Sequence, residues 1–137
     1  MKKLTHKAAK KKAWDAFSIY IRTRDAMLTT GTTENVVCCT CGKVYPAFGS
    51  GCAQAGHFIP GRRMSNLFDE RGCHAQCYNC NMRLKGNTLA YLDFMLEKYG
   101  AEVVAELREQ NEKTVQYKPF QLIELCEKFK QKTLDIV

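Results

Sequence analysis

Two pairs of cysteines have the spacing of metal ligands. Cys38 and Cys41 form one Cys-x-x-Cys pair, and Cys77 and Cys80 form the second. A gap of two residues lets both sulfurs of a pair bind one ion, and two pairs complete the tetrahedral shell that zinc prefers, at Zn–S distances of ~2.3 Å. Because this shell leaves no ligand position open for a substrate, the spacing predicts a structural Zn²⁺ site.

The other four cysteines leave alternatives open. The chain has 137 residues and eight cysteines, and clustered cysteines in a reducing compartment are more typical of metal sites than of disulfides. Cys39 lies inside the first pair, where it cannot easily share the geometry of both neighbours. Cys52 and Cys73 are interpreted either as core or loop thiols or as replacements for an assigned ligand. Cys126 falls on an apolar helix face, which favours a core position.

A histidine and an asparagine accompany the cysteine pairs. His57 lies in the segment GHFIP between the pairs, and Asn81 directly follows Cys80. A neutral imidazole can act as a base near pH 7, and an amide oxygen can bind a hard cation such as Mg²⁺. Taken alone, His57 is also explained as a hydrogen-bonded strand residue, and Asn81 as a helix cap.

The net charge of +7 is unevenly distributed. Residues 1–92 carry 14 Lys and Arg against 5 Asp and Glu, whereas residues 93–137 carry 7 against 9. The basic part indicates a polyanion such as DNA as a partner, since Lys and Arg that neutralise phosphates release counterions. The lysines at the very start are equally well explained as a solubilising tail. The residues expected to bind DNA phosphates flank the cysteine pairs: Arg62, Arg63, Arg71, Arg83 and Lys85.

Targeting signals are not recognisable in the sequence. No apolar run approaches the ~20 residues that span a bilayer. The basic start, MKKLTHKAAKKKAW, is not followed by the apolar segment of a secretory signal. We therefore expect a cytoplasmic protein with no membrane partner.

Hydrophobic periodicity predicts a mixed α+β chain around the site. Trp14, Phe17 and Ile21 share one apolar stripe, which is typical of a helix. The elements expected in chain order are a helix over 8–28, strands at 36–37, 44–45 and 56–60, an irregular segment over 61–76, and helices over 78–86, 88–99, 101–112 and from 119 onwards. The segments expected are a basic N-terminal helix over 1–35, a zinc-bound core over 36–87 and a C-terminal helical extension over 88–137. The C-terminal helices are expected to pack on one another and on the first helix, with the last helix as an alternative dimer interface.

The motifs together resemble a known family. A Cys-x-x-Cys pair, a strand carrying Gly-His and a Cys-x-x-Cys-Asn opening a helix are similar to the HNH, or ββα-metal, nuclease pattern. Four such cysteines with an Asn after the last also resemble phage endonuclease VII. More narrowly, AFSIYIRTRDA, CCTCGK, AGHFIPGRR, FDERGCHAQCYNCN, GN and LEKYG resemble the NinG (Rap) family of lambdoid phages over residues 12–110.

The resemblance implies a fold and a role. The fold would be a small zinc-anchored ββα-metal core with flanking N-terminal and C-terminal helices. The role would be a metal-dependent endonuclease of phage recombination, acting in the host cytoplasm on branched DNA such as a Holliday junction or D-loop. His57 would be the base, and Asn81 would bind a catalytic Mg²⁺ or Mn²⁺. His74 is expected either as a second ligand or phosphate contact or in a structural role, and a homodimer would suit two opposing cuts.

Two positions depart from the nuclease pattern. Gly56 stands where many of these enzymes carry a metal-binding Asp, and Gly72 stands where an Asn orients the histidine. Asp69 and Glu70 are the nearest acidic candidates for the missing ligand, although each suits a solvated loop equally well. Either Asn66 or Asn79 supplies the missing amide, or the histidine is held differently, or the activity is weak.

Two other functions compete with the nuclease. A non-catalytic zinc-containing DNA-binding protein would keep the cysteines and the basic half, and the missing Asp and Asn favour it. A protein-interaction domain would work through its acidic C-terminal helices, but it does not explain His57 together with Asn81.

Overall fold

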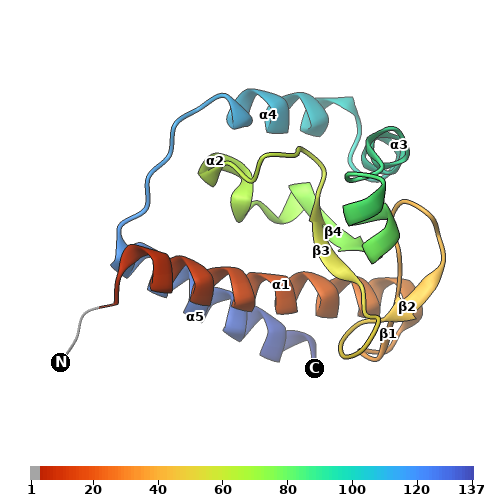
Figure 1. The fold of residues 1–137 in the computed structure, drawn as a ribbon, viewed down its shortest axis with the longest axis horizontal. Coiled ribbons are helices and arrows are strands. Elements are labelled where there is room, and N and C mark those ends of the chain that lie inside the picture. Colours follow the sequence, from red (N-terminus) through yellow and green to blue (C-terminus); the bar gives the residue numbers. More distant parts are fainter. Residues whose placement is uncertain (1–3) are drawn as a thin grey trace.

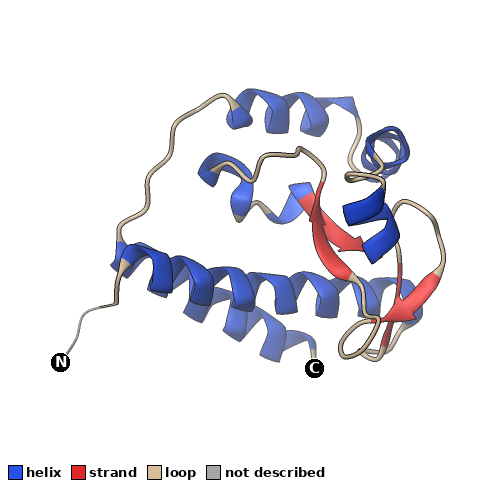
Figure 2. Cartoon of the chain, viewed as in Figure 1, coloured by secondary structure: helices blue, strands red, loops and turns tan. Residues whose placement is uncertain are grey.

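The computed structural model describes residues 4–137, which form a mixed α+β chain with two small sheets. Of the predicted segment 1–35, the first three residues lie outside the described residues, and with them Lys2 and Lys3. The helices are α1 (His6–Thr30), α2 (Met64–Leu67), α3 (Thr88–Lys98), α4 (Ala101–Asn111) and α5 (Pro119–Ile136), with single turns η1 (Glu70–Gly72) and η2 (Asn79–Arg83) (Figure 1). The strands are β1 (Asn35–Val37), β2 (Val44–Pro46), β3 (Gln54–His57) and β4 (Cys73–Gln76) (Figure 2).

The first helix, α1, confirms the helix predicted over 8–28 and extends it at both ends. The Thr5 hydroxyl caps its start by accepting from the Ala8 N–H at 3.1 Å. Gly31 ends it with a φ of 76°, a left-handed conformation that glycine adopts without strain. The helix runs past β1, β3 and β4, so one element braces both sheets.

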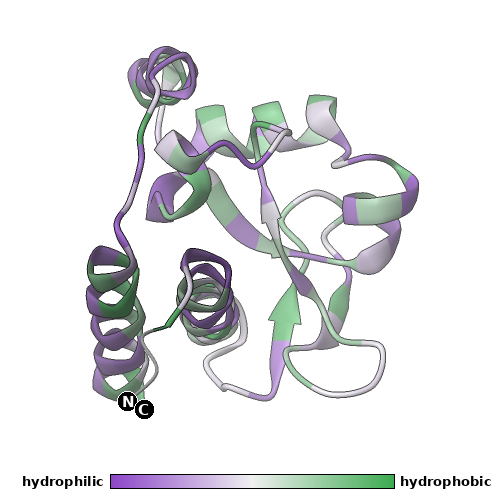
Figure 3. Cartoon of the chain, turned by 60° about the vertical axis from the view of Figure 1, so that its left-hand side comes forward, coloured by the Kyte–Doolittle hydropathy of each residue, from purple (hydrophilic) through white to green (hydrophobic). Residues whose placement is uncertain are grey.

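The main core lies between α1 and α5, which run side by side (Figure 1). The Phe17 and Phe129 rings meet edge to face with centroids 4.8 Å apart, and both are fully buried with Leu122. Figure 3 shows the apolar and hydrophilic stripes of the two helices. The prediction that the last helix packs on the first is confirmed. α3 and α4 instead build a second cluster around Tyr91 and Leu107, on the other side of the β3–β4 sheet.

The β1–β2 hairpin carries the first cysteine pair in its turn. Val36 pairs with Tyr45 and Val37 with Val44 in antiparallel register, which confirms the strands predicted at 36–37 and 44–45. Cys38 and the residues up to Lys43 form the turn, which the Cys38 N–H closes by donating to the Lys43 carbonyl at 2.9 Å.

The second sheet corrects two sequence predictions. The strand expected over 56–60 is β3, which starts earlier and ends at His57. The segment 61–76, expected to be irregular, contains α2, η1 and the strand β4, which pairs Gly56 with His74 and His57 with Cys73. All four residues of β4 are buried, so the strand shows none of the alternation that marks a half-exposed strand.

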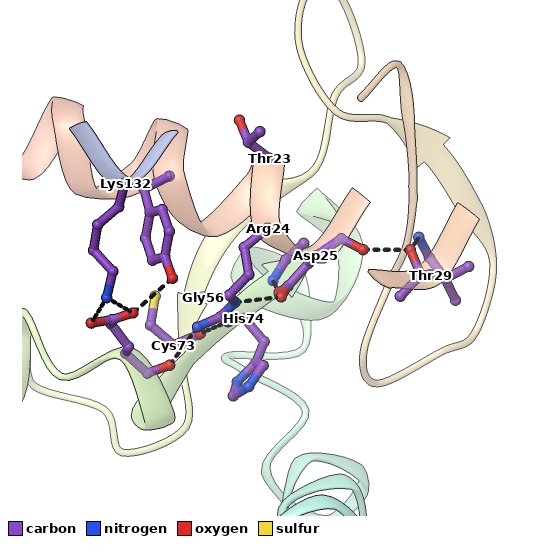
Figure 4. Close-up of polar contacts among 12 residues, drawn as sticks. Thr23, Arg24, Asp25, Thr29, Gly56, Cys73, His74 and Lys132 are labelled. Atoms are coloured by element: carbon purple, nitrogen blue, oxygen red, sulfur yellow. Dashed lines mark hydrogen bonds and ion pairs between the residues drawn. The ribbon is translucent and has the colours of Figure 1, made fainter. Parts of the chain in front are cut away.

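Polar side chains of α1 hold β4 in place (Figure 4). Asp25 accepts from the Ala75 N–H at 2.7 Å, and Arg24 donates to the carbonyls of Glu70 and Cys73 at 2.8 Å each. Arg24 and Asp25 also form an ion pair at 2.8 Å. These bonds satisfy the Ala75 N–H and the Cys73 carbonyl of β4 and the Glu70 carbonyl of η1.

The helix predicted over 78–86 is shorter than expected. One π-helical turn, Asn79–Arg83, follows the last cysteine pair. Lys85, Gly86 and Asn87 then adopt φ values of 52°, 96° and 47°, a left-handed run that ends the turn. Among residues 4–137, no helix combines the length and the apolar character needed to span a bilayer.

Candidate metal centre and adjoining cleft

The four predicted cysteine ligands meet at one point. The Sγ atoms of Cys38, Cys41, Cys77 and Cys80 all lie within 4.8 Å of one another, and those of Cys41 and Cys77 are 3.9 Å apart. Four sulfurs at ~2.3 Å from one tetrahedral ion would be roughly 3.8 Å apart. The chain therefore has a four-cysteine cluster that fits a structural Zn²⁺.

Donors surround the sulfurs of this cluster. Cys38 Sγ accepts from the Cys77 N–H at 3.3 Å, and Cys80 Sγ accepts from Asn87 Nδ2 at 3.6 Å. Burial raises the pKa of the Cys38 thiol, but hydrogen bonds from the Thr40 hydroxyl and the Cys77 N–H outweigh it and lower this pKa to about 6. Such bonds stabilise the thiolates that a metal requires.

The remaining cysteines lie outside the cluster. Cys39 packs against the second core, and burial raises its pKa. Cys73 and Cys126 are buried in the main core, and Cys52 Sγ accepts from Arg22 at 3.7 Å. Their positions agree with the core and loop interpretation rather than with the replacement of a ligand.

His57 is held with one ring nitrogen free. Its Nε2 lies 3.0 Å from the Leu67 carbonyl oxygen. A carbonyl only accepts, so Nε2 carries the proton, and Nδ1 of the neutral ring keeps its lone pair. The Trp14 ring stacks on the imidazole with centroids 5.3 Å apart. Burial lowers the pKa of His57 below 6.5, and the positive charge of Arg62 lowers it further. The hydrogen bond to the Leu67 carbonyl raises this pKa but does not outweigh the other two effects.

A cleft of about 310 Å³ brings four predicted site residues together. His57, Asn81, Arg62 and Lys85 line it with Trp14 and other residues. Trp14, Arg62 and Asn81 also line a second cleft of about 370 Å³. The first cleft thus joins an imidazole, an amide and two cationic groups, and Arg22 adds a third cationic group in the second cleft.

The backbone is unusual at both cationic residues of the cleft. Arg62 and Lys85 have φ values of 50° and 52°, in the left-handed region that residues other than glycine seldom adopt. The Arg62 guanidinium lies 4.3 Å from the centroid of the Trp14 ring. Such conformations persist where the surrounding structure fixes them, often at functional sites.

Gly56 lies against Gln76, a residue that the sequence analysis did not single out. A Cβ at this position would collide with Gln76 Oε1 and lie 3.2 Å from Asn81 Oδ1. Gln76 is fully buried, and within residues 4–137 its Oε1 has no hydrogen-bond partner. A neutral amide at a strand end carries no sequence signal of its own, so only the fold reveals it.

The structure does not bring His74 to the cleft. It is buried, with Nδ1 3.2 Å from the Tyr91 hydroxyl and Nε2 2.8 Å from the Tyr99 hydroxyl. The Tyr91 O–H donates to the Gly56 carbonyl at 2.6 Å, so His74 Nδ1–H donates to Tyr91 and Nε2 accepts from Tyr99. Burial lowers the pKa of His74 well below 6.5. Neither nitrogen is free for a cation or a phosphate, and the arrangement matches the structural alternative.

The acidic candidates are engaged elsewhere as well. Asp69 binds Arg71 at 3.0 Å, and Arg71 also binds Glu106 at 2.7 Å. Glu70 binds Lys132 at 2.7 Å. Arg71 is therefore committed to carboxylates, and Asp69 and Glu70 are not among the residues that line the two clefts.

The other predicted residues also lie outside the clefts. Arg63 and Arg83 are exposed but line neither cleft, and Asn79 is exposed on the π-helical turn. The amide of Asn66 is bonded to the Leu107 carbonyl at 3.0 Å and to Gln110. The Leu67 carbonyl, rather than an amide, therefore orients His57.

The hydrogen bonds predict the tautomers of two histidines. The chain has three histidines, so long-range ¹H–¹⁵N spectra of the ring nitrogens can be assigned with few variants. We expect the Nε2–H form for His57 and the Nδ1–H form for His74. Tyr91→Phe should shift the His74 signals and leave the tautomer of His57 unchanged, whereas an Nδ1–H form of His57 would contradict the arrangement.

Comparisons with known proteins place the chain among phage proteins. A family described as "Bacteriophage Lambda NinG protein" matches residues 1–136. "Protein ninG" of Salmonella phage P22 is 30% identical over 104 residues, which are 75% of this chain and 45% of that protein. "Protein ninG" of Escherichia phage 933W is 29% identical over 127 residues, 92% of this chain and 57% of that protein.

A third relative agrees with these two. "Protein ninG" of Escherichia phage lambda is 31% identical over 98 residues, 71% of this chain and 42% of that protein. The chain thus spans about half the length of the curated relatives it matches. No solved structure matches the chain.

Proposed function

Because the chain belongs to the bacteriophage lambda NinG family, we propose that it is a metal-dependent endonuclease of phage recombination that hydrolyses branched DNA, such as a Holliday junction or a D-loop. The strands β3 and β4 with the turn η2 would form a ββα-metal core of the HNH type. The observation that carries the proposal is the cleft that His57 lines together with Asn81, Arg62 and Lys85, with Nε2 of His57 bonded to the Leu67 carbonyl.

His57 is the base in this proposal. Its Nδ1 takes a proton from the attacking water, and the bond from Nε2–H to the Leu67 carbonyl keeps the ring in place while it becomes charged. The stacked Trp14 ring restricts the imidazole from the side. Since burial keeps the pKa of His57 below 6.5, the ring is neutral and ready to accept a proton at pH 7.

The cleft also offers groups for the phosphate and a cation. Asn81 presents an amide oxygen, a ligand type that hard cations accept, and its Nδ2 is fixed by a 2.7 Å bond to Gln54 Oε1. When bound, Mg²⁺ or Mn²⁺ would polarise the phosphate and stabilise the departing oxygen. Arg62 and Lys85 would bind phosphate oxygens and offset the charge that develops on them.

A non-catalytic DNA-binding protein with a structural zinc is the second candidate. Among residues 4–137, no Asp or Glu lines either cleft. The divalent cations of phosphoryl-transfer sites usually have one or two carboxylate ligands, so this absence favours binding without cleavage. Both candidates keep the DNA-binding surface and differ in hydrolysis.

Cleavage of synthetic DNA tests the proposal. The zinc-loaded chain should nick a four-way junction in Mg²⁺ or Mn²⁺ and should leave a linear duplex of the same sequence largely intact. No nicking with either cation, together with tight binding of the junction, would establish the second candidate instead. Size-exclusion chromatography of the junction complex tests whether two copies bind, as the homodimer prediction requires.

Salt dependence tests the contacts to DNA. If Arg62, Arg63, Arg83 and Lys85 each neutralise one phosphate, the slope of log K against log salt should be roughly −3 to −4. Lys85→Ala should reduce this slope by about one and weaken binding to every sequence alike. Arg71→Ala is the matched control, because Arg71 is paired with Asp69 and Glu106. A flat salt dependence of the wild type would contradict phosphate binding.

A further inference from the structure

Gly56 leaves a space beside His57 that the neighbouring strand fills. A Cβ at position 56 would collide with Gln76 Oε1, and the same Cβ would lie 3.2 Å from Asn81 Oδ1. Two amide oxygens, one from β4 and one from η2, therefore lie close to the position that the Cβ of an aspartate at position 56 would occupy.

Gln76 has its oxygen directed to this place by its own nitrogen. Nε2 donates to the Gly86 carbonyl at 2.8 Å and to the Thr40 hydroxyl at 3.1 Å. Because the Gly86 carbonyl can only accept, the amide cannot be turned around without losing a bond. Oε1 must face Gly56, where it is fully buried and where none of the described residues donates a hydrogen bond to it.

A buried oxygen without a donor calls for another partner. Buried polar atoms in folded proteins are nearly all paired, and an exception points to a water or an ion. Asn81 and His57 line the same cleft, so a water molecule or an ion bound between the two amide oxygens would lie at the edge of that cleft.

We propose that Gln76 Oε1 and Asn81 Oδ1 together bind the divalent cation, and that Gln76 replaces the carboxylate that position 56 does not supply. The role of this cation in hydrolysis rests on the proposed function, whereas its binding does not. Two neutral oxygens attract Mg²⁺ or Mn²⁺ weakly, and Arg62 and Lys85 add repulsion. The cation should therefore bind measurably but weakly by itself, and more firmly with a DNA phosphate, which supplies the missing negative charge.

Mn²⁺ alone is the probe for this site. Mn²⁺ added to the zinc-loaded chain should broaden the backbone amide signals of Gly56 and Asn81 by its unpaired electrons. The measured quantity is the half-broadening concentration, the Mn²⁺ concentration at which these amide signals have lost half of their intensity. Gln76→Met keeps the side-chain volume but removes the oxygen, and it should raise this concentration about tenfold or more. Unchanged broadening in a folded Gln76→Met chain would show that Gln76 only fills space and would overturn the proposal.

A pair of double variants separates the ligand from the packing. In Gly56→Asp/Gln76→Ala a carboxylate takes the place of the amide, and half-broadening should occur at about tenfold less Mn²⁺ than in the wild type. Gly56→Ala/Gln76→Ala relieves the same collision without an oxygen, and it should bind Mn²⁺ as poorly as Gln76→Met. Equal Mn²⁺ binding by the two double variants would also overturn the proposal.

These results are independent of cleavage. The zinc content and the backbone amide signals of α1 and α5 report whether each variant is folded. If Mn²⁺ binds as described but no DNA is cut, the cation site stands and the endonuclease fails. If DNA is cut by Gln76→Met as fast as by the wild type and broadening is unchanged, the endonuclease stands and the site assigned to Gln76 fails.

Discussion

Removal of the zinc should unfold the part of the chain that carries the cleft while the α1–α5 pair stays helical. The strands have only three or four residues each, and sheets of two such strands are not stable alone. The residues buried around the metal site are Cys38, Cys77 and Cys80 themselves, with Tyr45 packed against them, so without the ion little apolar packing joins the hairpin turn to η2. Zinc binding supplies ~10–16 kcal/mol in zinc-finger peptides, as much as the ~5–15 kcal/mol that stabilises a typical domain.

Cys80→Ser tests this prediction without a chelator. We expect less than one bound zinc per chain and rapid hydrogen exchange at the amides of Gly56 and Ala75. Phe17 and Phe129 belong to the other core, so most of the helical circular dichroism should persist. Cys52→Ser is the matched control, because its sulfur is not in the cluster. Slow exchange at Gly56 in the metal-free chain would show that zinc is not what holds the cleft.

His57→Ala should bind branched DNA as the wild type does and cut it about 10²–10⁴ times more slowly, which is the usual contribution of a general base. The imidazole supplies the lone pair that takes the proton of water, whereas phosphate binding is assigned to Arg62 and Lys85. Two quantities are measured for each variant: the single-turnover rate of DNA cleavage, and the dissociation constant of the DNA complex with Ca²⁺ as the cation. His6→Ala, an exposed histidine at the start of α1, is the control.

The pH profile gives the sign of the same effect. Burial lowers the pKa of His57 below 6.5, and the ring works as a base only when neutral. The cleavage rate should therefore rise as the pH increases through that lowered pKa. At pH 7 the rate should no longer change with pH on account of His57, because the ring is already neutral. His57→Ala should lose this rising limb. A rate that falls as pH rises from 5 to 7 would contradict the assignment.

The metal site could be predicted from sequence because its signal is local. A gap of two residues within each pair defines the geometry whatever lies between the pairs, and the structure gathers the same four sulfurs. The apolar stripe of α1 is equally local. The partner of each strand is not: β4 is buried on both faces, and its pairing with β3 leaves no pattern in the letters CHAQ.

The cleft could be predicted only in part. His57 and Asn81 stand out because residue type and neighbours point to chemistry, and both line the cleft. The partners that orient them are a backbone carbonyl, Leu67, and the neutral side chains Gln54 and Gln76, which no pattern marks. The sequence left the role of His74 open, because a histidine can either bind a ligand or serve internal hydrogen bonding, and here both ring nitrogens lie within hydrogen-bond distance of tyrosine hydroxyls.

The exposure of Cys41 has a practical consequence for handling the protein. Three sulfurs of the cluster are buried, and only Cys41 is exposed. Alkylating reagents and peroxide reach a thiolate through solvent, so they should attack this sulfur first and release the ion. Storage under mild reduction, with stoichiometric zinc added back, would protect the preparation at its single accessible ligand.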